Sequence, residues 1–389
     1  MKILRNLISK YIFGPEKNRA KIYKKVKNKA LKKGIFLSST SPLYKDIAKG
    51  NITGLTVPAF NIRTLTFDTA SAIFKVAKKT KSSAFILEIA KSEMKYTNQT
   101  PEEFALCVLA AAVKEKYKGQ VFLQGDHFCL KDTSESSVKD LENLILKSIE
   151  IGFYNIDIDC SSLAFEDNIK QTSNLLQFIK NNQPQGIEMA VGGEVNSIGG
   201  ANTTPEQLEN FLKNVQGLSK VACQTGTKHG GNVLPSGEIA QTNIDFENIK
   251  KLNLITKQYG LPGIVQHGAS TLEQSQFEEL NKAGVLEVHL STLFSDIVFD
   301  SKYFPKELKE KMYAYTEQTF NIEQKGASSY LQFIERFRKK SLGIFKKQIW
   351  QIPEKDIKKI KLELEEKFEF FFKVFGVNNT KDLVDKIYT

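Results

Sequence analysis

The sequence has no long apolar run and few cysteines. No stretch reaches the roughly 18 to 20 apolar residues that span a bilayer, which excludes a transmembrane helix. The opening residues, MKILRNLISKYIFGPEK, lack the apolar core and small-residue cleavage site of a signal peptide. Four cysteines are far apart and form no CxxC pair, which argues against a disulfide framework or a cysteine-rich zinc site. We therefore expect a reduced, cytoplasmic protein.

Acidic residues are scarce in one segment only. The formal net charge is +11, yet the Lys and Arg residues among the first 34 positions face a single acid, Glu16, so this segment carries the excess. Apolar residues recur here at helical spacing, which predicts a basic helical arm over residues 1–48. Such an arm is either solvated or docked on the body, or it contacts phosphates or anionic lipid. We expect no nucleic-acid or membrane partner, and the purpose of the arm stays open.

Eight short apolar runs follow one another between residues 55 and 293, with helical patterns between them. The runs lie at residues 56–62, 84–90, 121–127, 155–161, 188–195, 220–227, 263–268 and 286–292. Alternation of this kind favours parallel βαβ units. Eight units match a (β/α)8 TIM barrel over residues 49–300, followed by a C-terminal helical extension over 301–389. A doubly wound open sheet is the alternative, although no GxGxxG turn or P-loop supports a dinucleotide site.

Histidine is rare, and its placement is regular. His127, His229, His267 and His289 are the only histidines, and each lies at or just beyond the end of a predicted strand. In a closed parallel barrel these ends share one rim, so the four imidazoles should converge. Several neutral imidazoles at one point favour a zinc site. Asp126 and His127 are adjacent, so both can face this point only if the backbone leaves β geometry, and Gly125 before them permits that.

The motifs at these strand ends are similar to those of the class II, metal-dependent fructose-bisphosphate and ketose-bisphosphate aldolases. The resemblance covers most of residues 50–300 and depends on the order and spacing of short pieces. These pieces are VPAFNI, KYT, GDH, IDIDCSSLAFEDNI, GGEVNSIGG, TGTKHG, QHGAST and HLST.

The resemblance implies a metal centre and an acid/base residue. It gives Asp126 the exchange of a proton with the substrate hydroxyl at the cleaved bond. It places Asp159 and Glu194 near the metal, where an alternative metal position is associated with them. The implied cofactor is Zn2+ or another divalent metal, with a monovalent cation as a further candidate. The implied zinc ligands are His127, His229 and His267.

The resemblance also implies a substrate site. Asn61 matches a residue that contacts substrate. One phosphate would be held by backbone amides and hydroxyl groups, at the positions of Gly230, Gly268, Ser270, Ser291 and Thr292. Small residues at such positions allow the backbone to approach an anion closely.

Some positions depart from the common family pattern. His289 stands where the eighth strand usually carries an Asn that touches substrate; it replaces that hydrogen bond, adds a metal contact or adjusts specificity. Ala90 replaces a Ser at the end of the second strand, so one phosphate contact is in doubt. The candidates for a second-phosphate ligand in the extension are Arg336, Arg338, Lys339 and Lys340.

The function that these features predict is reversible cleavage of fructose 1,6-bisphosphate into dihydroxyacetone phosphate and glyceraldehyde 3-phosphate, a step of glycolysis and gluconeogenesis. Tagatose 1,6-bisphosphate or another ketose bisphosphate is an alternative. Tagatose differs from fructose only in the configuration of one hydroxyl, and no residue in the sequence indicates which configuration is bound. A non-catalytic, aldolase-like accessory subunit is a second alternative. A third is a nucleic-acid or membrane binder that uses residues 1–34. We expect a homodimer or a higher homo-oligomer.

Overall fold

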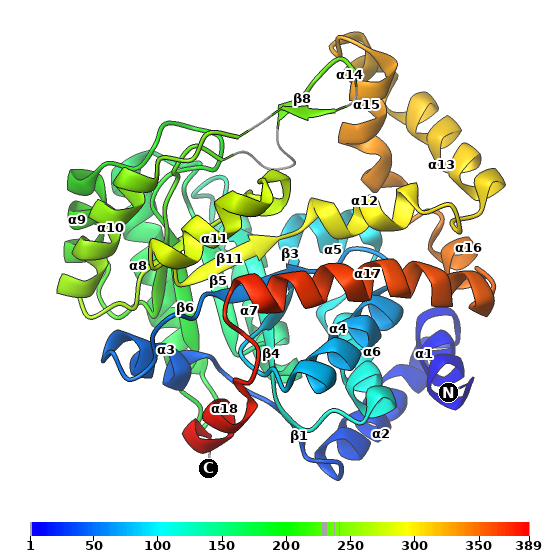
Figure 1. Cartoon of the computed structure of the whole chain (residues 1–389), viewed down its shortest axis with the longest axis horizontal. Helices are drawn as coiled ribbons and strands as arrows, with labels where there is room; N and C mark the ends of the chain where they lie inside the picture. The colour runs from blue at the N-terminus through cyan, green and yellow to red at the C-terminus, as the bar shows by residue number, and fades with distance from the viewer. Residues whose placement is uncertain (1, 228–231, 237, 241, 389) are drawn as a thin grey trace.

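A closed barrel of eight parallel strands forms the centre of the computed structural model, which describes residues 2–227, 232–236, 238–240 and 242–388 (Figure 1). Neighbours along the chain pair in turn, β11 pairs with β2, and β4 pairs with β5, so the sheet closes on itself. The strands of the barrel are β2 (Val57–Asn61), β3 (Ile86–Ala90), β4 (Gly119–Cys129), β5 (Asn155–Asp159), β6 (Ala190–Glu194), β7 (Lys220–Ala222), β10 (Ile264–Gln266) and β11 (Glu287–Leu290). The predicted (β/α)8 barrel is confirmed, and the open-sheet alternative is excluded.

The strands are short and buried because helices cover the outer face and side chains fill the interior. Every residue of β2, β3 and β6 is buried, as expected for parallel strands with both faces covered. All eight predicted runs overlap a strand. The sixth is shorter than predicted, because β7 ends at Ala222.

Helices connect the strands and begin at residues suited to capping. Thr100 accepts a hydrogen bond from the backbone of Glu103 and is followed by Pro101, and Thr204 and Gln207 form a capping box, as the TPEE and TPEQ sequences predict. The helices of this region are α4 (Thr66–Thr80), α5 (Lys91–Thr97), α6 (Pro101–Glu115), α7 (Glu135–Ile151), α8 (Phe165–Asn182), α9 (Pro205–Asn214), α10 (Phe246–Gln258), η2 (Ala269–Thr271), α11 (Gln274–Lys282) and α12 (Thr292–Asp300).

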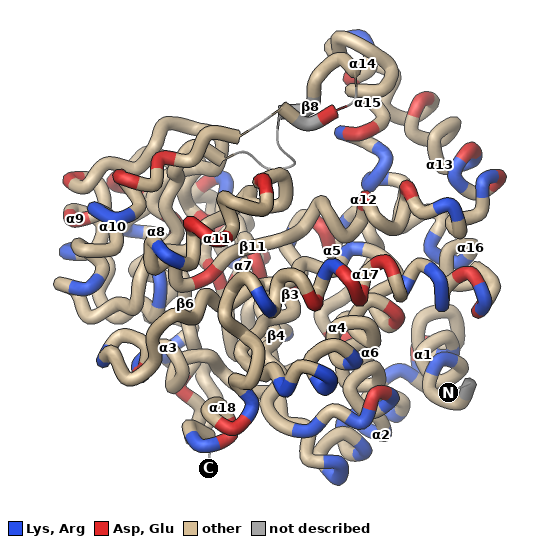
Figure 2. Tube along the Cα trace, viewed as in Figure 1, with Lys and Arg blue, Asp and Glu red and all other residues tan. Residues whose placement is uncertain are grey.

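The N-terminal arm packs on the barrel. It consists of α1 (Lys2–Phe13), η1 (Glu16–Asn18), α2 (Arg19–Leu31), β1 (Ile35–Leu37) and α3 (Ser41–Ala48). Arg5 forms an ion pair with Asp68 of α4, and the hydroxyl of Tyr23 donates to the carbonyl of Ile151 at 2.8 Å. β1, which the sequence did not predict, pairs with the start of β4. Exposed lysines cover the outer face of α2 (Figure 2).

The C-terminal extension is helical, as predicted. α17 lies against α4 and α12, and its Phe368 and Phe372 rings pack on Phe60 of β2, with centroids 5.0 and 5.7 Å away. Its helices are α13 (Lys306–Thr319), α14 (Asn321–Lys325), α15 (Tyr330–Phe337), η3 (Arg338–Ser341), α16 (Lys346–Trp350), α17 (Glu354–Val374) and α18 (Lys381–Ile387).

A small hairpin of β8 (Asn232–Val233) and β9 (Ile239–Ala240) lies between β7 and α10 in the sequence. It approaches the extension, where the Ser329 hydroxyl donates to the carbonyl of Pro235 (Figure 1). Among the described residues, no helix combines the length and hydrophobicity that crossing a membrane requires.

Candidate active site

A cavity of about 800 Å³ opens at the carboxyl ends of the barrel strands. Active sites of (β/α)8 barrels lie at this end. The residues of the predicted centre that line it come from five different strands or strand ends, which fits the predicted convergence. Those of the predicted centre are Asp126, His127, Asp159, Glu194, His267 and His289.

The backbone leaves regular β geometry where Asp126 and His127 meet. His127 has a φ of 40°, and the pairing of β4 with β5 changes register between Gly125 and Phe128. A β carbon on Gly125 would lie 2.5 Å from the Phe128 ring, so this position needs glycine. The bulge turns Asp126 and His127 toward the same cavity, and the predicted departure from β geometry is confirmed.

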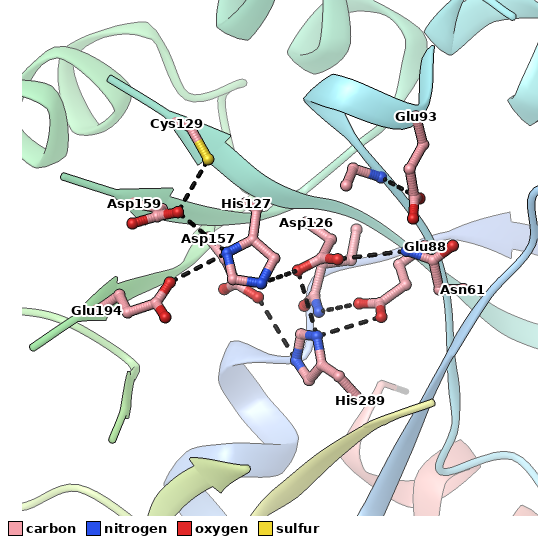
Figure 3. Close-up of polar contacts among 12 residues, drawn as sticks. Asn61, Glu88, Glu93, Asp126, His127, Cys129, Asp157, Asp159, Glu194 and His289 are labelled. Carbon is pink, nitrogen blue, oxygen red and sulfur yellow. Dashed lines mark hydrogen bonds and ion pairs between the residues drawn. The ribbon is translucent and has the colours of Figure 1, made fainter. Parts of the chain in front are cut away.

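His127 is oriented by carboxylates on one side of its ring. Its Nδ1 lies 3.1 Å from Oδ2 of Asp159 and 3.0 Å from Oε2 of Glu194 (Figure 3). Burial alone would lower the pKa of His127, but the carboxylates of Asp126 and Glu194 hold that pKa well above its usual range. Burial raises the pKa of Glu194 to about 7, helped by the Asp159 carboxylate. Because the carboxylates hold the Nδ1–H of His127, its Nε2 is the nitrogen that can bind a metal.

His267 completes a group of donor atoms with the capacity to hold a metal ion. Its ring centroid lies 4.4 Å from that of His127. Ligand atoms of Asp126, His127 and His267 all lie within 4.8 Å of one another. Imidazole nitrogens with a carboxylate oxygen suit zinc and similar divalent ions, so the donor set fits the implied metal. His229 and Gly230 lie outside the described residues.

A second donor group overlaps the first on the Asp159 side. It consists of His127, Cys129 and Asp159, and the thiol of Cys129 donates to Oδ2 of Asp159 at 2.8 Å. Because Asp159 contacts both the Cys129 thiol and Nδ1 of His127, it can orient the His127 ring. The alternative metal position implied for Asp159 and Glu194 stays a prediction.

Asn61 and His289 each contact one oxygen of the Asp126 carboxylate. Nδ2 of Asn61 donates to Oδ2 at 3.3 Å, and Nδ1 of His289 lies 3.3 Å from Oδ1. His289 is itself flanked by carboxylates. Glu88 lies 3.1 Å from its Nδ1 (Figure 3), and Glu287 lies 2.6 Å from its Nε2. Its ring lies against His267, at 4.0 Å between centroids. His289 also belongs to two groups of donor atoms that lie within 4.8 Å of one another, one with Glu88 and Asp126 and one with Asp157 and Glu287, so the three roles open for it stay predictions.

A network of buried charges in the barrel interior was not predicted from the sequence. Lys220 of β7 contacts Glu287 at 2.5 Å, Asp157 at 3.0 Å and the side-chain oxygen of Gln124 at 2.7 Å. Burial raises the pKa of Glu88 to about 7 and that of Asp157 to about 6, although nearby His289 and Lys220 oppose the rise. The available clue was the presence of charged residues inside buried strands, since such residues require partners.

The predicted phosphate residues that the structure describes, Gly268, Ser270, Ser291 and Thr292, all line the cavity. Gly268 has a φ of 67°, and Oγ of Ser270 accepts a hydrogen bond from the backbone N–H of Ser291 at 2.7 Å. Thr292 begins α12, and Arg63 reaches its hydroxyl at 3.4 Å. Arg63 was not predicted; its clue is its position just after β2. Ala90 lines the cavity, so the departure there leaves a methyl group at the site.

The four basic candidates of the extension have different surroundings. Arg338 is buried and forms ion pairs with Asp296, Asp300 and Glu335, so its charge is already matched. Lys340 lies over aromatic rings, and Arg336 is exposed on α15. Lys339 is the one of the four that lines the cavity.

Comparison with known proteins concerns the family and the fold of the chain. The family model described as class II fructose-bisphosphate aldolase matches residues 42–376. A fructose-bisphosphate aldolase structure from Campylobacter jejuni is similar in fold, with 18% identity over 89% of this chain and 97% of that one and a TM-score of 0.58. The YdjI aldolase from Escherichia coli K12 has 18% identity over 88% and 98% and a TM-score of 0.50.

The fold is also shared outside this activity. A fructuronate-tagaturonate epimerase from Cohnella laeviribosi has 11% identity over 83% of this chain and 81% of that one, with a TM-score of 0.58. At sequence identities of 11% to 18%, structural similarity shows only that the fold is shared. The family model, in contrast, spans most of the sequence, and the chain belongs to the class II fructose-bisphosphate aldolase family.

Proposed function

We propose that this protein cleaves fructose 1,6-bisphosphate reversibly into dihydroxyacetone phosphate and glyceraldehyde 3-phosphate. The reaction class follows from the family, and the residue roles follow from the resemblance of the motifs; the described cavity residues support those roles, while His229 lies outside the described part of the chain. His127, His229 and His267 would hold zinc or another divalent ion. When bound, that ion would supply Lewis-acid stabilisation of the negative charge on the former carbonyl oxygen.

Asp126 would remove the proton from the hydroxyl of the departing half. As this O–H bond breaks, its electron pair forms the new aldehyde carbonyl, and the electrons of the broken C–C bond pass to the ketone half as an enediolate. The carboxylate is prepared for this step, since Asn61 and His289 each approach one of its oxygens. Such orientation before substrate binds lowers the entropic cost of reaching the transition state.

One observation carries the proposal. Asp126 and His127 come from a bulged strand, and the bulge brings a carboxylate and an imidazole to the same point as His267. A regular strand would have sent one of the two side chains to the opposite face. An acid/base group beside metal-binding nitrogens is the arrangement that metal-assisted C–C cleavage requires.

A lysine Schiff base at the barrel core is the competing chemistry. Lys220 is the buried lysine of the strands, but its ammonium is engaged by Glu287 and Asp157. Burial alone would lower the pKa of Lys220, yet these two carboxylates keep it above its usual value, so the amine stays protonated. A protonated amine is not a nucleophile.

Steady-state cleavage assays test the proposal. The purified chain is given fructose 1,6-bisphosphate or tagatose 1,6-bisphosphate, with and without a chelator, and its metal content is measured. We expect cleavage that the chelator abolishes and that zinc restores. A chain without bound divalent metal and without activity on either sugar would support the accessory-subunit alternative instead.

A further inference from the structure

Lysines cover the outward side of α2, and the rest of the protein does not supply their charge. The first 34 residues hold the whole formal excess of +11, because basic and acidic side chains balance in the remainder of the sequence. Basic positions gather along this helix (Figure 2). We call the exposed lysines of α2 and its C-cap the α2 lysine face; they are Lys21, Lys24, Lys25, Lys29 and Lys32.

The apolar side of α2 holds these lysines outward. Ile22, Tyr23, Val26 and Ala30 are buried, and α2 packs against α6. The hydroxyl of Tyr23 fixes the helix further, because it donates to the carbonyl of Ile151 at 2.8 Å. The arm is therefore docked on the body, and the charges of the α2 lysine face point to solvent.

The α2 lysine face has no ion-pair partner within the part of the chain that the structure describes. The two other basic residues of the helix already have contacts. Nε of Arg19 donates to the carbonyl of Tyr11 at 3.3 Å, and the ammonium of Lys27 lies 5.8 Å from the centroid of the Tyr23 ring. The positive charge of the face is thus left for a partner outside the chain.

Three lysines of the face form a row along the helix. Lys21, Lys25 and Lys29 follow one another at four-residue spacing, which places them about 6 Å apart along the helix axis. Like charges at this spacing destabilise a helix. A chain of negative charges laid along the row would replace this repulsion with attraction.

The surroundings of the row indicate the kind of anion that fits it. A membrane-surface helix inserts its apolar side into lipid, but the apolar side of α2 is used against α6. Protein interfaces are depleted in lysine, whereas lysine contacts to phosphates supply essentially all of the sequence-independent affinity for nucleic acids. Phe36 of β1, just beyond the helix, is 45% exposed and offers an aromatic ring to an unpaired base.

We propose that the α2 lysine face binds the phosphate backbone of a single-stranded nucleic acid, without preference for base sequence. A single strand is favoured over a duplex, because its bases are free to stack on Phe36. This proposal departs from the expectation that the arm has no nucleic-acid partner. It does so because the fold arranges the excess charge as one outward row that no described carboxylate matches.

The α2 lysine face is separate from the cavity. β1, which continues from α2, pairs with Gly119 at the start of β4, whereas Asp126 stands near the carboxyl end of the same strand. Binding of nucleic acid and cleavage of sugar should therefore be independent of each other. The proposal does not rest on the proposed function.

Fluorescence anisotropy of a labelled oligouridylate tests the proposal on the full-length protein. The row variant is Lys21→Gln/Lys25→Gln/Lys29→Gln, in which Gln keeps a high helix propensity. At about 0.1 M salt it should bind about 100-fold more weakly than the parent, the loss expected for three phosphate contacts to a single strand. The slope of log K against log salt should become shallower by about 2.

A matched control removes the same charge elsewhere. It carries Lys147→Gln, Lys170→Gln and Lys251→Gln, at exposed lysines of α7, α8 and α10. This control should bind oligouridylate nearly as the parent does. The row variant should keep at least the parental Tm, since it removes like-charge pairs from the helix, and it should cleave substrate at the parental rate.

The outcomes are distinct. Equal oligouridylate binding by the parent and the row variant would overturn the proposal, as would equal losses in the row and control variants. Binding of the parent to vesicles that contain phosphatidylserine, without binding to oligouridylate, would also overturn it and assign the face to membranes. A protein that binds oligouridylate through the row and cleaves neither ketose bisphosphate would keep this proposal and reject the proposed function.

Discussion

Nδ1 of His289 lies 3.3 Å from Oδ1 of Asp126, while the amide of Asn61 donates to the other oxygen of the same carboxylate. Asp126 is therefore approached at both oxygens by residues of two strands that pair with each other, β11 and β2. His289 in turn contacts Glu287 and Glu88. The orientation of Asp126 thus depends on buried charges that extend through the barrel interior.

The first prediction concerns Asp126 itself. Asp126→Asn removes the proton acceptor and keeps the size of the side chain, so turnover should fall about 100- to 10,000-fold, the usual contribution of general acid–base catalysis. Metal content, measured by elemental analysis, should stay near that of the parent, because the three proposed imidazole ligands remain. Cleavage at near-parental rates would show that another group accepts the proton.

A second prediction separates positioning from catalysis at His289. His289→Asn shortens the side chain, which loosens Asp126 and should lower kcat about 10-fold with a smaller change in KM. Since His289 acts through Asp126, adding the same change to Asp126→Asn should cost little more. Independent, multiplying effects in the double variant would mean that His289 contacts substrate directly. Rates of all three variants decide between these outcomes.

Most of the barrel was predictable from the sequence. Buried parallel strands are continuous apolar runs, and helix starts such as Thr100 with Pro101 are encoded locally. The short strand β1 was missed, because three residues carry too little periodicity and its pairing partner Gly119 lies far along the chain. The sequence predicted that the backbone must leave β geometry at His127, because the adjacent Asp126 and His127 both had to face one point. It did not predict the form that this departure takes.

The charged network was not predictable in the same way. Glu88, Lys220 and Glu287 stand inside apolar runs, which shows that they need partners but not which partners. Lys220 meets the side chain of Gln124 across 96 residues of sequence, a contact that exists only once the barrel has closed. Arg63 follows the first strand of the barrel and Lys339 lies in the C-terminal extension, yet both line the cavity, and sequence spacing gave no reason to join them.

Metal removal gives a third prediction. Ligands that bind only the folded state stabilise it by mass action, so stripping the ion with a chelator should lower Tm as well as abolish cleavage. Re-addition of zinc should restore both. His267→Ala should show the low Tm and low activity of the stripped parent and should no longer respond to zinc. A zinc-induced rise in Tm that survives His267→Ala would place the ion elsewhere.

A fourth prediction concerns Lys339, the candidate ligand of a second phosphate that lines the cavity. Burial and the charge of Arg63 lower its pKa to about 8, so phosphate affinity should fall as pH rises through about 8, because the ammonium form is the one that holds an anion. The other charged groups that act on Lys339 are Arg63, Glu93, Asp296 and Lys340. All of them remain in Lys339→Arg, whose guanidinium stays charged across this range. Calorimetric titrations from pH 7 to about 9.5 should therefore show the loss in the parent and not in Lys339→Arg.

The bulge that aims Asp126 and His127 gives the last prediction. In Gly125→Ala the added methyl group would lie 2.5 Å from the Phe128 ring, so either the ring or the bulge must move. Overpacking of this kind costs about 1 to 3 kcal/mol of unfolding free energy. Gly326→Ala is a suitable control, because its new methyl group would meet its nearest neighbour at an ordinary 3.6 Å.

Urea denaturation of both proteins measures the change in unfolding free energy. Cleavage assays at urea concentrations below the unfolding transition measure the effect on activity. If the bulge holds the acid/base group against the metal ligands, Gly125→Ala should lose activity well before it unfolds, whereas Gly326→Ala should match the parent in both respects. A Gly125→Ala protein that is less stable but fully active would show that Asp126 and His127 keep their orientation without the bulge, and the link between backbone geometry and catalysis would have to be given up.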